Sequence, residues 1–314
     1  MSSTKLLYLL GLLTVALPEL GSGRRLGYVM DDTSIRTAVT EWLDENPAVN
    51  AAAYATYGHI STWDTGGVTD MSYLFNGRSD FEQFKKGARE FNEDISAWQT
   101  SGVTDMTKMF TYAYAFDQPI GSWNVGLVTS MEGMFYNAQS FNQSLNGWDV
   151  ANVENMATMF AATLVFNQPL GDWNVGAVTK ANGMFNGASA FNQALDSWDL
   201  SAASNIGYMF IFANSFDQDL GWCVDNNVQL GKAFCGTACE STACGVVQGA
   251  CTTATLAPTG VVARSQRRFA GFDVGECEPA PSPAPAAGAL GSDGARKTTI
   301  YYLSAATLLF LVAF

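Results

Sequence analysis

The chain has 314 residues, of which 48% are hydrophobic and only 14% are charged, so it is too apolar for a disordered protein and long enough to bury a sizeable core. Acidic residues outnumber basic ones by 29 to 16, and the net charge of −13 argues against nucleic acids and anionic lipid head groups as partners. A single histidine, His59, excludes a multi-histidine metal site and leaves one candidate for a histidine-dependent catalytic triad.

Residues 1–23 have the pattern of a secretory signal peptide. Lys5 ends a short polar start, residues 6–17 form an apolar stretch too short to span a bilayer, and small residues follow at 21–23. Because such a segment directs a chain out of the cytoplasm, we expect a secreted protein or one on the extracellular face of the plasma membrane.

Residues 24–56 are predicted to form a helical cap in front of the repeats. Four apolar residues recur on one helical face: Ile35, Val39, Trp42 and Leu43. Residues 32–34 can start this helix, and Asn46-Pro47 ends it. His59 falls where the cap meets the first repeat, and we expect it to be a hydrogen-bonded structural residue.

Residues 57–222 repeat with a period of 25. Five tryptophans carry this period: Trp98, Trp123, Trp148, Trp173 and Trp198. Trp222 follows one residue early, and Trp63 precedes the series by 35 residues because one repeat carries ten extra residues. A fixed period of this length is typical of solenoids, so we predict about seven stacked coils in an α/β repeat solenoid. The tryptophans are expected in its core rather than as platforms for sugar stacking.

Each repeat divides into two expected elements. In one repeat, Trp123 and Val125 would lie on one face of a strand, and residues 128–135 carry apolar side chains at helical spacing. We expect neighbouring strands to pair in parallel, with a short helix or helical turn after each strand.

A row of asparagines falls in register in successive repeats: Asn142, Asn167 and Asn192. We expect this row to be buried and to hydrogen-bond the backbone from coil to coil. Asn142 also begins an N-glycosylation sequon with Gln143 and Ser144, but burial in the row argues against its occupancy.

The repeated pattern W-(D/N)-V-x-x-V-T-x-M-x-x-M-F-x-x-A-x-x-F-(N/D)-Q-x-(I/L) resembles the repeat of the BspA-like surface proteins, relatives of the leucine-rich-repeat proteins. The match covers about half the chain, and Ala181 and Ile206 depart from it where methionine is usual. The resemblance implies a leucine-rich-repeat-like stack of parallel strands and short helical turns. It further implies a secreted or surface protein used for adhesion or binding, without enzymatic activity.

Residues 223–277 contain all six cysteines and form the expected C-terminal cap: Cys223, Cys235, Cys239, Cys244, Cys251 and Cys277. An even number of cysteines in a secreted chain predicts three disulfides, for which fifteen pairings are possible. A zinc site is the alternative, but this segment has no histidine and no paired C-x-x-C spacing.

Residues 278–299 are rich in Pro, Ala and Gly and are expected to form an extended stalk. Residues 300–314 end the sequence in an apolar segment that is short for a membrane-spanning helix. The pattern favours a glycolipid-anchor signal, and an ordinary C-terminal membrane anchor remains the alternative.

A row of polar side chains on the exposed strand face is the expected ligand-binding site: Asp64, Asn124, Asp149, Asp172, Asn174 and Asp199. The row could hydrogen-bond a glycan or a protein, or hold calcium, whereas the simpler interpretation is that an exposed strand face needs polar residues. The inserted segment carries a basic cluster that offers a second surface: Arg78, Lys85, Lys86 and Arg89.

We therefore expect a non-enzymatic surface protein for adhesion, recognition or matrix assembly, which needs no cofactor and no catalytic residue. Its partner would be a protein or glycan on another cell or in the matrix. The alternative function is a secreted carbohydrate-active solenoid that cleaves or binds polysaccharides. A catalytic carboxylate pair would break the repeat, and Asp172 is the main acid on this face that does so.

Overall fold

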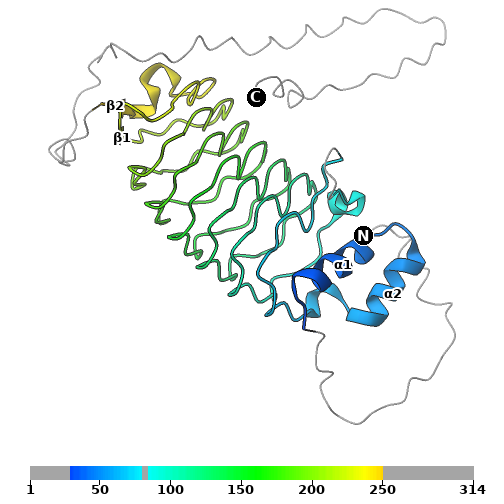
Figure 1. Ribbon diagram of the computed structural model, residues 1–314. Coiled ribbons are helices and arrows are strands. Elements are labelled where there is room, and N and C mark those ends of the chain that lie inside the picture. The colour runs from blue at the N-terminus through cyan, green and yellow to red at the C-terminus, as the bar shows by residue number, and fades with distance from the viewer. Residues whose placement is uncertain (1–28, 80–83, 250–314) are drawn as a thin grey trace, which may run out of the picture.

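The structure is a computed structural model that describes residues 29–79 and 84–249 (Figure 1). Two helices, α1 (Asp32–Trp42) and α2 (Pro47–Tyr57), lie at one end of a stack of coils. At the other end, β1 (Cys223–Val224) pairs in parallel with β2 (Val247–Gln248). The described residues also form short 3₁₀ helices: η2 (Ile60–Thr62), η3 (Lys86–Glu90) and η4 (Glu240–Gly245).

Several expected segments lie outside the described residues, namely the signal peptide (1–23), the stalk (278–299) and the C-terminal anchor signal (300–314). In the two ranges that are described, every helix is too short or too polar to cross a bilayer.

The helix α1 forms where the sequence predicts a helical cap. Asp31 is its N-cap residue, and the Asp31 carboxylate accepts hydrogen bonds from the backbone N–H groups of Thr33 and Ser34 at 3.1 and 2.7 Å. The expected apolar face is confirmed, because its residues are buried or pack against the core: Ile35, Val39, Trp42 and Leu43.

The sequence analysis did not predict α2. Asn46 and Pro47 follow α1 as expected, but the same two residues also begin a second helix. The Asn46 side chain accepts a hydrogen bond of 3.0 Å from Ala48 N, and Pro47 occupies the first turn, where its missing N–H costs nothing. The cap therefore consists of two helices.

Asp32 joins the helical cap to the first coil. Its carboxylate accepts hydrogen bonds from the backbone N–H groups of Thr69 and Asp70, at 2.7 and 3.0 Å, and from the Thr69 hydroxyl at 2.8 Å. Met30 N also donates to Asp64 O at 2.8 Å. The edge of the first coil is thus covered, as a parallel stack requires.

The coils that follow pair in parallel, one repeat with the next, as predicted. One position of each coil forms a continuous series of parallel bridges: Asp70–Asp105, Asp105–Ser130, Ser130–Asn155, Asn155–Lys180, Lys180–Asn205 and Asn205–Gln229. The pairing runs beyond Trp222, where the sequence analysis ended the repeats.

The location of the pairing differs from the prediction. The bridges fall in the segments that were expected to be helical, and the segments around the tryptophans that were expected to be strands contain turns. Lys108 N and Phe110 N donate to Glu132 O and Met134 O of the next coil, each at 2.8 Å. A helix would have used these N–H groups within its own turn.

Successive β-turns explain why the helix prediction was wrong. Met109 N donates to Met106 O at 3.2 Å, and Ala113 N donates to Phe110 O at 3.0 Å. Lys108, inside the first of these turns, has a φ of 53°. Apolar side chains three residues apart fit such i to i+3 turns as well as they fit a helix, so the spacing alone could not distinguish the two.

The tryptophans form the expected buried column. From Trp63 to Trp222 the repeat tryptophans are only 3 to 5% exposed, and the rings of Trp148 and Trp173 stack at 6.5 Å between centroids. From Trp98 onward, each indole nitrogen also donates to a carbonyl of the preceding coil, as Trp148 Nε1 does to Ile120 O at 3.1 Å, whereas Trp63 Nε1 donates to Gly58 O at 3.2 Å. These rings are therefore not available as platforms for sugars.

The asparagine row forms coil-to-coil hydrogen bonds, as predicted. Asn142 N donates to Asp117 Oδ1 at 2.9 Å, and Asn167 N donates to Asn142 Oδ1 at 3.0 Å. The row, here called the Asx ladder, is longer than expected and has these members: Asn92, Asp117, Asn142, Asn167, Asn192 and Asp217. The expected burial was wrong, because Asn142 is only half-buried and Asn167 is exposed.

The C-terminal cap continues the coil path and is closed by disulfides. Cys239 and Cys244 are bonded to each other. Cys223 and Cys235 each take part in a disulfide as well. Leu220 N donates to Cys244 O at 2.8 Å, which ties this cap to the last repeat. The zinc alternative is contradicted for these four cysteines, because disulfide sulfurs are not available as thiolate ligands. Cys251 and Cys277 lie outside the described residues.

Candidate binding surfaces

Apart from Asp64, which forms a parallel bridge with Val29, the predicted ligand-binding residues lie at turns rather than on the expected strand face. Five of them occupy the same position of their coils, with Gln99 at this position between the first two, and are called the Asx row here: Asp64, Asn124, Asp149, Asn174 and Asp199. All except Asp64, which is half-buried, are exposed to solvent. The residue type at this position suits the turn, because Asp and Asn side chains readily accept hydrogen bonds from their own backbone.

Each side chain of the Asx row is held by its own turn. The Oδ1 atom of Asp149 accepts a hydrogen bond of 3.2 Å from Ala151 N, and that of Asp199 accepts one of 2.9 Å from Ser201 N. Asn124, Asn174 and Asp64 accept from the residue two positions later in the same way. This hydrogen bond fixes the orientation of each side chain, so the row presents a regular series of polar groups.

Asp172 does not belong to this series. It is exposed, and its Oδ2 atom accepts a hydrogen bond of 3.2 Å from the Asn146 side chain of the preceding coil. The structure thus separates Asp172, which bridges two coils, from Asn174, which caps its own turn. Within residues 29–79 and 84–249, no three His, Cys, Asp or Glu side chains gather as a set of metal ligands.

The basic inserted segment contacts both the helical cap and the first coils. Lys86 forms an ion pair of 2.8 Å with Glu45, just after α1. Arg89 Nε donates to Gly77 O at 2.7 Å, and the Arg89 guanidinium lies 5.8 Å from the centre of the Tyr114 ring. These contacts fix the segment between the helical cap and the first coils.

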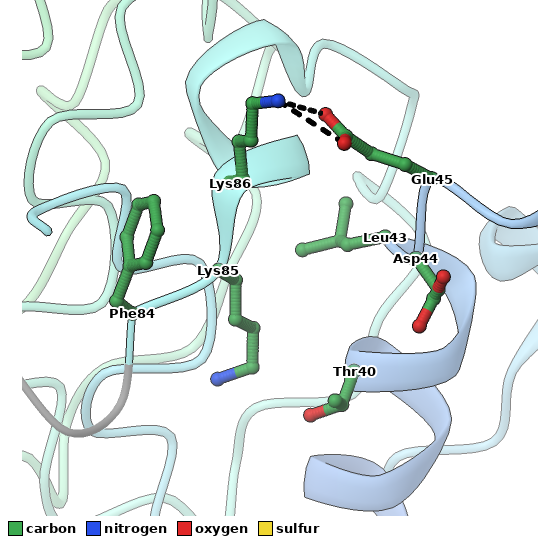
Figure 2. A pocket seen from close by; sticks show the side chains of 7 residues that line it. All are labelled: Thr40, Leu43, Asp44, Glu45, Phe84, Lys85 and Lys86. Carbon is green, nitrogen blue, oxygen red and sulfur yellow. Dashed lines mark hydrogen bonds and ion pairs between the residues drawn. The ribbon is translucent and has the colours of Figure 1, made fainter.

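A pocket lies between the end of α1 and this inserted segment (Figure 2). It has a volume of about 290 Å³ and is lined by Thr40, Leu43, Asp44, Glu45, Phe84, Lys85 and Lys86. Figure 2 shows Lys85 and Lys86 pointing in opposite directions, with Lys86 paired to Glu45. The pocket walls carry both signs of charge, so they favour neither an anion nor a cation.

Lys85 is the most perturbed basic group of this pocket. Burial lowers the pKa of the Lys85 amine to about 8, and the positive charge of Arg36 lowers it further in the same direction. Its nearest hydrogen-bond acceptor is Tyr73 O at 3.4 Å. The burial of Lys85 could not be predicted from the sequence, because it depends on α1 packing over the segment.

His59 has the structural surroundings that were expected. Its Nδ1 atom lies 2.8 Å from the Ser61 hydroxyl, at the start of η2, and its Nε2 atom lies 3.3 Å from a Glu93 carboxylate oxygen. The Trp42 ring packs edge-on against the imidazole at 5.3 Å. These contacts join the helical cap to the first coils.

A polar network on another surface of the stack was not predicted from the sequence. Lys108 forms an ion pair of 2.8 Å with Glu132, and Asn155 donates to the second Glu132 oxygen at 3.1 Å. Burial alone would raise the pKa of Glu132, but the hydrogen bond and charge of Lys108 outweigh it and hold this pKa below its usual value. When the repeats are aligned with one another, these residues fall at three different positions, so the repeat pattern does not bring them together.

Comparison with known families agrees with the repeat architecture. A family described as "Mycoplasma protein of unknown function, DUF285" matches residues 46–167 and 145–243, which together cover more than half of the chain. The chain belongs to the DUF285 family. The two DUF285 matches include the second helix of the cap, the coils and three of the cysteines. No curated protein and no solved structure matches the chain.

Proposed function

We propose that this DUF285 protein is a non-enzymatic cell-surface or secreted protein for adhesion, recognition or matrix assembly, which binds a protein or glycan through the Asx row. We further propose that its coils are a leucine-rich-repeat-like solenoid of the BspA-like type. The Asx row is the observation that carries the proposal. Its polar side chains, all exposed except that of Asp64, are held by their own turns and recur at the same position of the coils.

The spacing of the Asx row suits an extended ligand. Because the coils pair in parallel, equivalent side chains recur at about 4.8 Å, the distance between neighbouring strands. Hydrogen bonds join each coil to the next, and the tryptophan column fills the space between them. A rigid surface loses little entropy on binding, which favours affinity from many weak polar contacts.

The oxidised cysteines support a location outside the cytoplasm. All four described cysteines are disulfide-bonded, and disulfides persist mainly in secreted and surface proteins. Together with the expected signal peptide and C-terminal anchor, they favour a protein attached to the membrane by its C-terminal end. We propose that its partner lies on another cell or in the surrounding matrix.

The test compares two variants that lose the same number of turn-capping side chains. The first carries Asp149→Ala and Asp199→Ala in the Asx row. The control carries Asp105→Ala and Asn205→Ala, which remove the caps of Thr107 and Gly207 at the bridge positions. Purified full-length proteins are applied to glycan and protein arrays, and cells displaying them are scored for adhesion.

We expect the Asx-row variant to lose at least tenfold in binding to the ligands that the unmodified protein selects, while the control binds them normally. Equal binding by both variants would show that the ligand occupies another surface, with the inserted segment as the next candidate. Hydrolysis of a polysaccharide that is abolished by Asp172→Asn would instead establish the carbohydrate-active alternative.

A further inference from the structure

The Asx ladder uses only one of the two polar atoms of the Asn142 side chain. Asn142 Oδ1 accepts hydrogen bonds from Asn167 N and from Gln168 Nε2, each at 3.0 Å. The ladder thus depends on a side-chain oxygen that points along the stack. The amide nitrogen of Asn142 forms no hydrogen bond within the described part of the chain.

Other members of the ladder show that this amide nitrogen is dispensable. Asp117 lacks an amide nitrogen, yet its Oδ1 atom accepts from Asn142 N and Gln143 Nε2, each at 2.9 Å. The ladder geometry is therefore the same with a carboxylate as with an amide. A substituent on the Asn142 nitrogen would leave the ladder hydrogen bonds intact.

The amide nitrogen of Asn142 is also not enclosed, although the side chain as a whole is half-buried. Among the half-buried and buried side chains that the structure describes, the only enclosed polar atom without a hydrogen-bond partner is Asn76 Nδ2. Asn142 Nδ2 has no partner either, but it is not among the enclosed atoms, so it must be accessible from the surface. The expectation that burial would protect Asn142 is thus overturned.

Asn142 begins the only Asn-x-Ser/Thr sequence in the chain, because Ser144 follows two residues later. The next asparagines of the ladder lack this feature, since Asn167 is followed by Gln-Pro and Asn192 by Gln-Ala. We propose that Asn142 is N-glycosylated on Nδ2. This inference rests on the secretory location that is part of the proposed function.

The chemistry needs a lipid-diphosphate-linked oligosaccharide as the donor and an oligosaccharyltransferase of the cell that makes the protein. The Asn142 nitrogen attacks the anomeric carbon of the first sugar and loses one proton. A C–N bond forms, the C–O bond to the diphosphate breaks, and the lipid diphosphate leaves. The folded protein has to accommodate the product at a side-chain nitrogen that is not enclosed and takes no part in the ladder hydrogen bonds.

The experiment uses the full chain expressed in eukaryotic cells that perform N-glycosylation. Peptides of the purified protein are analysed by mass spectrometry after enzymatic release of glycans in ¹⁸O water, which marks a formerly glycosylated asparagine as labelled aspartate. Two variants serve as matched controls. Asn142→Asp keeps the ladder oxygen but removes the acceptor nitrogen, and Ser144→Ala removes the sequon without changing Asn142.

We expect a labelled residue 142 and a glycan-sized mass shift in the unmodified protein, and neither in the two variants. Asn142→Asp should have the same melting temperature as Ser144→Ala, which keeps an unglycosylated Asn142, because the ladder persists with a carboxylate oxygen. An unlabelled Asn142 in protein whose Cys239–Cys244 bond has formed would overturn the glycosylation proposal alone. An unlabelled Asn142 in protein with reduced cysteines would overturn the secretory location, and the glycosylation proposal with it.

Discussion

Lys108 and Glu132 form an ion pair of 2.8 Å between neighbouring coils. Both side chains are half-buried, and Asn155 of the following coil donates to the free oxygen of Glu132 at 3.1 Å. Three successive coils are therefore joined by side chains as well as by backbone hydrogen bonds. A charged pair in this setting is stronger than a fully exposed one but is still moderated by solvent.

The pair makes stability depend on pH in the acidic range. The hydrogen bond and charge of Lys108 hold the pKa of Glu132 below its ordinary 4.5 against the opposing effect of burial. Glu132 thus contributes stability above pH 4.5, and this contribution is lost as the pH falls through the lowered pKa. Glu132→Gln should lower the free energy of unfolding by about 1 kcal/mol at pH 7.

The measurement is urea unfolding of the unmodified protein and of Glu132→Gln from neutral to acidic pH. The difference in unfolding free energy should shrink as Glu132 becomes protonated. A difference that stays constant across this range would show that the charge of Glu132 does not contribute. Lys108→Met provides the matched control, because it removes the partner charge and should abolish the same pH dependence.

Gly133 lies beside this pair in a conformation that favours glycine. Its φ is +58°, and a Cβ atom added there would lie 3.2 Å from Lys108 Cγ. Gly133→Ala should therefore destabilise the protein by roughly 1–2 kcal/mol in urea unfolding. Thr158 occupies the equivalent position of the next coil with a φ of 53°, so Thr158→Gly should not destabilise it. If Thr158→Gly destabilised the protein more than Gly133→Ala does, the left-handed backbone conformation at this position would be contradicted.

Substitutions of Trp148 test the buried tryptophan column. Trp148→Ala removes a ring that is 3% exposed and should cost roughly 3–5 kcal/mol in unfolding free energy. Trp148→Phe keeps an aromatic ring but loses the indole N–H, which donates to Ile120 O at 3.1 Å, and should cost less. Urea unfolding in which Trp148→Ala costs no more than Trp148→Phe would mean that ring packing is not the main contribution.

Lys85 should reduce stability at neutral pH. Burial lowers the pKa of its amine from 10.5 to about 8, so the folded state resists the protonation that the unfolded chain accepts. The cost is fully present below about pH 8 and disappears as the pH rises toward 10.5. Lys85→Met should stabilise the protein by about 2 kcal/mol at pH 7 and by less at higher pH. Equal stabilisation at both pH values would show that the amine is not desolvated.

The cysteines are expected to be fully oxidised in the full-length protein. Cys239 and Cys244 are bonded, Cys223 and Cys235 are disulfide-bonded, and three bonds are expected within residues 223–277. Alkylation under non-reducing conditions followed by mass spectrometry should therefore label no cysteine. Label on Cys251 or Cys277 would contradict the expectation of three bonds, and label on Cys223, Cys235, Cys239 or Cys244 would contradict the structure.

The sequence by itself determined the period, the parallel stacking and the identity of the core. Each coil lies on an equivalent coil, so the large apolar side chains are buried at the same position of every repeat, as Trp148 and Trp173 are. The coil-to-coil role of Asn142 and Asn167 follows for the same reason. The helix α1 was also predictable, because its capping signals and apolar face are local.

Only the tertiary structure decided the path of the backbone within each coil. The same spacing of apolar residues fits a helix and a series of turns, and pairing with the next coil favours the turns because it satisfies N–H groups such as Lys108 N. The partner of Glu132 and the burial of Lys85 depend on contacts between different columns of the repeat and with α1. The open side of Asn142 likewise depends on which way the ladder faces, and a periodic pattern contains no information about that direction.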